Sequence, residues 1–104
     1  MSSERSRTRK PATDIGAFIA RSPNIRGGRP RIAGTGVTVQ RIISWYKLGL
    51  SPEEIVDEFG HLTLAQVHAA LAYYHANPDE IEADMEMEVA EVERLKQEQS
   101  RRVP

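Results

Sequence analysis

The chain has 104 residues, of which 28% are charged and 39% hydrophobic, and its formal net charge is −1. This length allows one domain with a small core and argues against a deep catalytic cavity. There is no cysteine, which excludes a disulfide framework and a thiolate metal site and is typical of a reducing cytoplasm. No apolar run approaches the ~20 residues of a membrane span, and the basic N-terminus lacks the apolar core of a secretory signal. We therefore expect a cytoplasmic protein without membrane contact.

The charge is divided unevenly between the two halves. Residues 1–50 hold ten Lys and Arg against two acidic residues, a net +8, whereas residues 51–104 hold four against thirteen, a net −9. Such asymmetry favours two partners, with phosphate suiting the basic half and a protein suiting the acidic half. The alternative is that the opposite charges attract each other in a dimer or only keep the chain in solution.

The first segment, residues 1–13, is basic and has no apolar periodicity, which predicts a disordered arm. A basic arm can follow a DNA backbone, or it can be a solvated tail.

Between residues 14 and 38, single apolar residues alternate with turn formers. Gly27-Gly28 lies between two short segments, Pro23–Arg26 and Arg29–Ala33, which predicts a β-hairpin because a tight turn needs positive φ at both central residues. The glycines match neither a P-loop nor a dinucleotide fingerprint. Four nearby arginines favour contact with a nucleic-acid backbone, the alternative being a solvated strand edge; these are Arg26, Arg29, Arg31 and Arg41.

Three short helices are predicted next. The first begins after Thr38 and ends near Leu48, with Val39, Ile42, Ile43 and Tyr46 on one apolar face and Trp45 beside it. The second and third each begin with a capping box, a hydroxyl and an acid or amide three residues apart. Two such helices joined by a short turn at Gly60 are the outline of a helix-turn-helix. The capping pairs are Ser51 with Glu54, and Thr63 with Gln66.

The third helix, residues 64–76, is unusual for a DNA-reading helix because it has no Lys or Arg. Its periodicity places Leu64, Val67, Leu71 and Tyr74 inside, and it places outside Ala65, Gln66, Ala69, Ala72 and Tyr73. Thr63 and Gln66 are the candidate DNA contacts here, since glutamine can pair with an adenine edge. The small outer residues are equally typical of a helix-packing surface.

Histidines recur every seven residues at His61, His68 and His75. Seven helical residues separate two side chains by ~10.5 Å, too far to share one zinc ion. No nucleophile–base set is present either. We expect no metal, no cofactor and no enzymatic activity.

Asn77-Pro78 predicts the start of a last helix that runs to about Gln99. Its apolar stripe is narrow and closer to a coiled-coil seam than to a core-facing surface, so we expect it to bind a second copy or another protein. The predicted partner-binding residues are the stripe, Ile81, Met85, Val89, Val92 and Leu95, together with the cations Arg94, Arg101 and Arg102.

Much of residues 15–82 resembles the "domain of unknown function 433" family of small prokaryotic proteins. The resemblance rests on Gly27-Gly28, Pro30, Ile32, Gly34-Thr35, Val39, Gly49, Ser51, Glu53-Glu54-Ile55, Leu62-Thr63, Val67, Ala70-Leu71 and Tyr73-Tyr74. It implies a mainly α fold: a homeodomain-like or winged-helix-like helix-turn-helix bundle after a short N-terminal β-hairpin, followed by the long C-terminal helix. The family usually has arginine after the Gly-Thr pair, where this chain has Gly36.

The resemblance also implies an antitoxin of a type II toxin–antitoxin system: a homodimer that binds operator DNA and regulates its own transcription. Residues 78–104 would neutralise a PIN-like ribonuclease toxin, and residues 14–77 would form the hairpin and helix-turn-helix domain. On this division, deleting residues 79–104 abolishes inhibition and leaves DNA binding intact. The alternative is an adaptor that does not bind DNA and dimerises through the helix-turn-helix.

Overall fold

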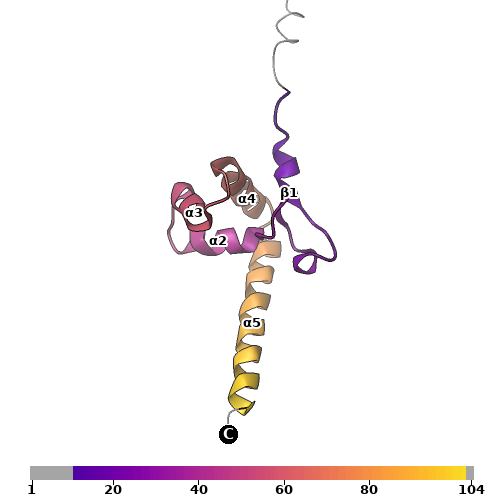
Figure 1. Cartoon of the computed structure of the whole chain (residues 1–104), viewed down its shortest axis with the longest axis vertical. Helices are drawn as coiled ribbons and strands as arrows, with labels where there is room; N and C mark the ends of the chain where they lie inside the picture. Colours follow the sequence, from indigo (N-terminus) through magenta and orange to yellow (C-terminus); the bar gives the residue numbers. More distant parts are fainter. Residues whose placement is uncertain (1–10, 103–104) are drawn as a thin grey trace, which may run out of the picture.

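A computed structural model describes residues 11–102 of the chain (Figure 1). Within them, a small body of short elements carries one long helix that extends away from it. The predicted arm, residues 1–13, lies mostly outside the described range. In chain order the elements are the 3-10 helix η1 (Ile15–Phe18), β1 (Ile19–Ala20), the 3-10 helix η2 (Arg26–Gly28), β2 (Arg31–Ile32), α2 (Val39–Lys47), α3 (Pro52–Phe59), α4 (Leu64–Ala76) and α5 (Pro78–Arg102).

The helix boundaries follow the predicted caps. Thr38 accepts a hydrogen bond from the backbone N–H of Arg41 at the start of α2. Both reciprocal bonds of the capping box are present at Ser51 in α3 and at Thr63 in α4. Gly60 has a φ of 75° and ends α3 in the left-handed region, which favours glycine. The outline of a helix-turn-helix is therefore confirmed.

The hairpin is present, but its first strand lies elsewhere than predicted. Strand β1 pairs antiparallel with β2 in the register Ile19 with Ile32 and Ala20 with Arg31. The prediction of a strand over Pro23–Arg26 with a tight turn at Gly27-Gly28 was wrong. Both glycines do have positive φ, 64° and 78°, but they belong to η2 within the longer connection of residues 21–30.

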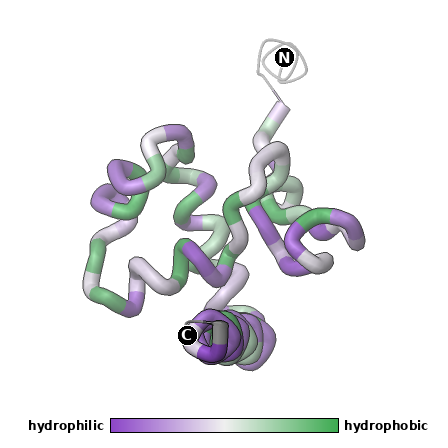
Figure 2. Tube along the Cα trace, turned by 60° about the horizontal axis from the view of Figure 1, so that its bottom comes forward, coloured by the Kyte–Doolittle hydropathy of each residue, from purple (hydrophilic) through white to green (hydrophobic). Residues whose placement is uncertain are grey.

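The core lies where α2, α3 and α4 meet, and it includes β2 and the first turns of α5. Ile32, Ile42, Ile55 and Ile81 are each fully buried. Ile81 stands in the first turn of α5, so the long helix begins as part of the body. Figure 2, which looks nearly along α5, shows the body to one side of the helix axis.

Four side chains depart from the predicted faces, one of which is Tyr73, expected outside but packed against the core. Tyr46 and Leu64 were expected inside but are 36% and 41% exposed. Ala69 was expected outside but is only 5% exposed. The burial of Ala69 has a physical reason: α4 contacts η1 and β2 in addition to α2, α3 and α5, so the N-terminal segment covers a face that periodicity alone assigns to solvent.

Candidate nucleic-acid interface

Three of the four predicted arginines converge on one hollow beside the N-terminus of α2. The hollow has a volume of about 270 Å³. Its lining comes from η2, the Gly34–Gly36 turn, α2 and α5, and consists of Arg26, Arg29, Gly36, Thr38, Gln40, Arg41 and Glu88. We call this the arginine pocket. Arg26 and Arg29 are neighbours at η2, and the fold brings Arg41 of α2 to the same hollow.

Arg26 reaches the pocket through a contact with Gly36. Its Nε donates to the carbonyl oxygen of Gly36 over 3.0 Å. A Cβ added at Gly36 would lie only 3.2 Å from Nη2 of Arg26. The absence of a side chain at position 36 therefore makes room for the Arg26 guanidinium. Gly36 does not have a positive φ, so its backbone conformation does not require glycine.

Arg29 and Arg41 stand on the other sides of the pocket. Nε of Arg29 lies 3.9 Å from Oδ1 of Asp84 in α5, and the Arg29 side chain is 29% exposed. The guanidinium of Arg41 stands over the ring of Phe59, 5.8 Å from its centroid, which holds the cation at the surface. Within the described residues, neither Arg26 nor Arg41 forms a salt bridge.

One polar bridge crosses the pocket floor. Gln40 is 4% exposed, and its amide nitrogen donates to a carboxylate oxygen of Glu88 in α5. Its Oε1 is buried without a hydrogen-bond partner in the described part of the chain. Sequence reasoning missed both residues; the only available signal was that Gln40 falls beside Val39 at the start of an otherwise apolar face.

Arg31, the fourth predicted arginine, does not line the arginine pocket. It is 7% exposed, and its Nη2 donates to Oγ of Ser22 over 2.9 Å. Its Nε and Nη1 are buried and have no partner among the described residues. Arg31 is therefore not a surface cation, because β2 places it on the covered side of the hairpin.

The capping bonds of α4 engage its two predicted DNA contacts. Oγ1 of Thr63 accepts from the N–H of Gln66 over 3.1 Å, and Oε1 of Gln66 accepts from the N–H of Thr63 over 2.8 Å. A bidentate pair with adenine needs both Oε1 and Nε2 of glutamine. While the cap is intact, only Nε2 of Gln66 is available to a base edge.

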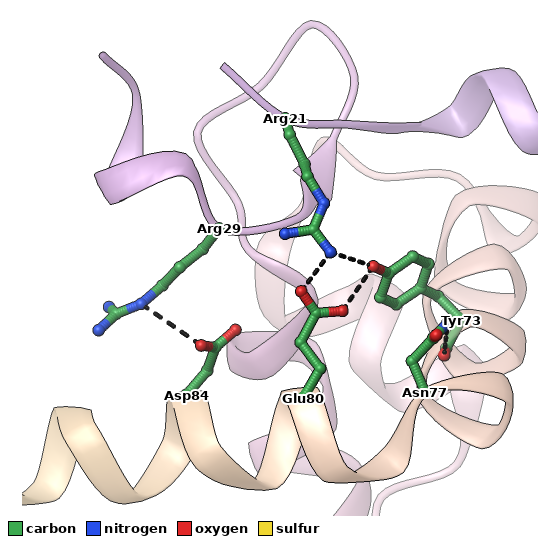
Figure 3. A network of polar contacts seen from close by, with 6 residues as sticks. All are labelled: Arg21, Arg29, Tyr73, Asn77, Glu80 and Asp84. Atoms are coloured by element: carbon green, nitrogen blue, oxygen red, sulfur yellow. Dashed lines mark hydrogen bonds and ion pairs between the residues drawn. The ribbon is translucent and has the colours of Figure 1, made fainter. Parts of the chain in front are cut away.

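The start of α5 is tied to the body by ion pairs (Figure 3). Arg21 pairs with Glu80, and the Tyr73 hydroxyl donates to Glu80 over 2.6 Å. Burial alone raises the pKa of Glu80, but the hydrogen bonds from Tyr73 and Arg21 bring it below its ordinary value. Burial raises the pKa of Asp84, an effect that Arg29 only partly offsets.

A second tie lies on α2. Lys47 pairs with Glu82, and the Tyr74 hydroxyl donates to the same carboxylate over 2.6 Å. The hydrogen bond from Lys47 is the main reason that the pKa of Glu82 is lowered. Part of the charge asymmetry between the two halves is therefore neutralised inside the chain.

The predicted partner-binding residues divide into two groups. Ile81 is fully buried in the chain's own core and Met85 packs against that core, so Ile81 is not a free contact. Val89, Val92 and Leu95 are 63%, 44% and 52% exposed. Arg94 is exposed and pairs with Glu91, and Arg101 is exposed near the end of α5, which closes with Arg102.

The described residues offer neither a metal cluster nor a membrane-spanning helix. No group of three or more histidine or acidic side chains there is arranged to hold a metal ion. None of the helices in residues 11–102 combines the length and apolar character needed to cross a bilayer.

Comparisons with known proteins place the chain in a family. The family described as "Protein of unknown function (DUF433)" matches residues 19–74. The chain is similar to a solved structure described as a DUF433 member protein from Anabaena variabilis ATCC 29413, with 28% identity and a TM-score of 0.62 over 65% of this chain and 67% of that one. No curated protein matches. The matched residues span β1 to α4, the part of the fold that builds most of the arginine pocket, and the chain belongs to the DUF433 family.

Proposed function

We propose that this chain is the antitoxin of a type II toxin–antitoxin pair, which binds operator DNA at the arginine pocket and a PIN-like ribonuclease through the outer part of α5. The observation that carries the proposal is the separation of two free surfaces. Arg26 and Arg41 face one hollow and have no salt-bridge partner in residues 11–102, while Val89, Val92 and Leu95 lie beyond the body. The resemblance to antitoxins supplies the two partners.

The DNA part of the proposal rests on phosphate contacts. Guanidinium groups bind phosphate oxygens with paired hydrogen bonds, and such contacts give affinity that falls steeply with salt. The arginine pocket offers such groups beside the start of α2. The Nε2 of Gln66 is a donor that the capping bonds leave available for a base edge.

The toxin part rests on the outer half of α5. PIN-like nucleases hold a metal ion with carboxylates, and a cationic side chain placed there competes with the metal. Arg94, Arg101 and Arg102 lie in the last turns of α5, beside the exposed part of the stripe.

The experiment is a truncation chosen from the structure. Deleting residues 79–104 removes Ile81 and hence part of the core, so it does not separate the two functions. A chain ending at Ala90 keeps Ile81, Met85 and Glu88 and removes the outer stripe and the three arginines. We expect it to bind operator DNA with unchanged affinity and to lose inhibition of the ribonuclease. Retained inhibition contradicts the assignment of the toxin surface.

A second candidate is the adaptor that does not bind DNA. It is favoured by the covering of α4 by η1 and by the ion pairs that neutralise Arg21, Arg29 and Lys47 inside the chain. An adaptor shows weak binding to the operator with little dependence on salt, whereas the antitoxin shows a steep loss of binding.

A further inference from the structure

The apolar stripe of α5 continues past the end of the body. Ile81 and Met85 pack into the core, and the same helical face then carries Val89, Val92 and Leu95, each about half exposed or more. Figure 1 shows that this outer part of α5 has no neighbouring element among the described residues. An exposed stripe of this kind on a long helix is typical of a surface that another helix covers.

Two shallow hollows lie on this face where α5 leaves the body. One, of about 340 Å³, is lined by Glu82, Met85, Glu86, Val89 and Ala90. The other, of about 150 Å³, is lined by Ser44, Met85, Glu88 and Val89. Both combine apolar side chains with glutamates, which suits a segment that presents aliphatic groups together with a cation.

The charges of α5 are ordered along its length. Residues 79–93 contain eight acidic side chains and no Lys or Arg, whereas residues 94–102 contain four cations and one acid. A copy of this helix laid antiparallel brings each cationic end beside the acidic stretch of the other. A parallel copy opposes like charges along the whole length, which is unfavourable.

We propose that α5 pairs with α5 of a second copy of this chain, antiparallel and centred on Val92. In this register Val92 meets its own copy, Val89 lies level with Leu95 of the second copy, and Lys96 of the second copy lies level with Glu88, beside the glutamate-lined hollows. The pairing explains the stripe and the charge order together, and it depends on neither DNA nor a ribonuclease. A partner that covers the same stripe competes with it.

The interface is small, since only about three apolar side chains per copy are newly covered, so association is weak. We expect a dimer dissociation constant in the micromolar range, which sedimentation equilibrium of the full chain measures. Val92→Glu places two carboxylates at the centre of the pair and weakens dimerisation at least about tenfold. Met87→Glu is the matched control, because Met87 is 59% exposed on the same helix but on the face away from the stripe. We expect this variant to dimerise with unchanged affinity. Circular dichroism confirms that both variants keep their helices.

Orientation is measured separately with one spin label. The chain has no cysteine, so Ser100→Cys, at an exposed position of α5, gives a single label. Antiparallel pairing about Val92 separates the two labels by about 24 Å along the helix axis, whereas parallel pairing brings them to roughly 10 Å. A distance of roughly 10 Å between the two labels contradicts the antiparallel orientation.

The proposal itself is contradicted if the chain stays monomeric throughout the micromolar range. It is also contradicted if Val92→Glu and Met87→Glu weaken dimerisation equally. Either result counts against the pairing whether or not α5 binds a ribonuclease.

Discussion

The hydroxyl of Tyr73 in α4 donates a hydrogen bond to Oε1 of Glu80 in α5 over 2.6 Å, across the junction at Asn77 (Figure 3). Asn77 itself donates from its side chain to the carbonyl of Tyr73, so the junction is bonded on both sides. These bonds fix the direction in which α5 leaves the body.

The first prediction concerns this bond. Tyr73→Phe keeps the ring and removes the hydroxyl, so we expect the free energy of unfolding to fall by about 1 kcal/mol, measured by urea denaturation. Tyr46→Phe is the control, because the structure shows no hydrogen bond to the Tyr46 hydroxyl among the described residues; its effect is expected within about 0.5 kcal/mol. Equal effects from the two variants contradict a stabilising role for the Tyr73–Glu80 bond.

The second prediction follows from the pKa of Glu80, which the hydrogen bonds of Tyr73 and Arg21 hold below the ordinary value of 4.5. The folded chain keeps this carboxylate ionised where the unfolded chain protonates it. Its stabilising contribution is therefore present above pH 4.5 and is lost as the pH falls through the lower, folded-state pKa.

Glu80→Gln should accordingly lower stability at neutral pH and reduce the loss of stability on acidification. The ionised carboxylate of Asp84 has the opposite effect on stability. Burial raises its pKa, so the ionised form destabilises the fold above that pKa. Asp84→Asn should therefore leave stability at neutral pH unchanged or higher. Urea titrations at a series of pH values measure both effects, and parallel pH profiles for Glu80→Gln and the wild type contradict the assignment.

The third prediction tests whether α5 begins inside the core. Ile81 is fully buried, so Ile81→Ala is expected to cost about 2–4 kcal/mol of unfolding free energy. Val92→Ala on the outer stripe removes a comparable side chain from a 44% exposed position and is expected to cost no more than about 0.5 kcal/mol in the monomer. A small effect at Ile81 would mean that α5 folds apart from the body.

The helices were predictable from the sequence because their signals are local. The capping pairs at Ser51 and Thr63, the cap at Thr38 and the stop at Gly60 each depend on neighbouring residues, and all are confirmed. The strand at Ile19–Ala20 was missed because a two-residue strand has no periodicity and its partner follows a long connection. The faces of α4 and the burial of Arg31 depend on how the N-terminal segment folds back, which no local pattern encodes.

The sequence predicted the arginines of the arginine pocket, but it did not predict how the fold arranges them. The clustering of arginines between residues 26 and 41 was visible in the sequence. The exclusion of Arg31, the floor made by Gln40 and Glu88, and the contact of Arg26 with Gly36 required the three-dimensional arrangement.

The fourth prediction concerns that contact. A side chain at position 36 meets the Arg26 guanidinium, the flexible end of a side chain, and not rigid backbone. Gly36→Ala should therefore change stability by no more than about 0.5 kcal/mol while displacing Arg26 and weakening DNA binding as much as Arg26→Gln does. If the double variant is weaker than either single variant, Gly36 acts independently of Arg26.

The central claim is that the arginine pocket binds the phosphates of operator DNA. Its most direct measurement is the salt dependence of DNA affinity, by fluorescence anisotropy, for Arg41→Gln and for Arg94→Gln as a control of equal charge on the outer part of α5. We predict a steep loss of affinity with salt for the wild-type chain, a slope reduced by about one for Arg41→Gln, and no change for Arg94→Gln. A flat salt response of the wild type, or equal slopes for all three chains, would contradict the claim.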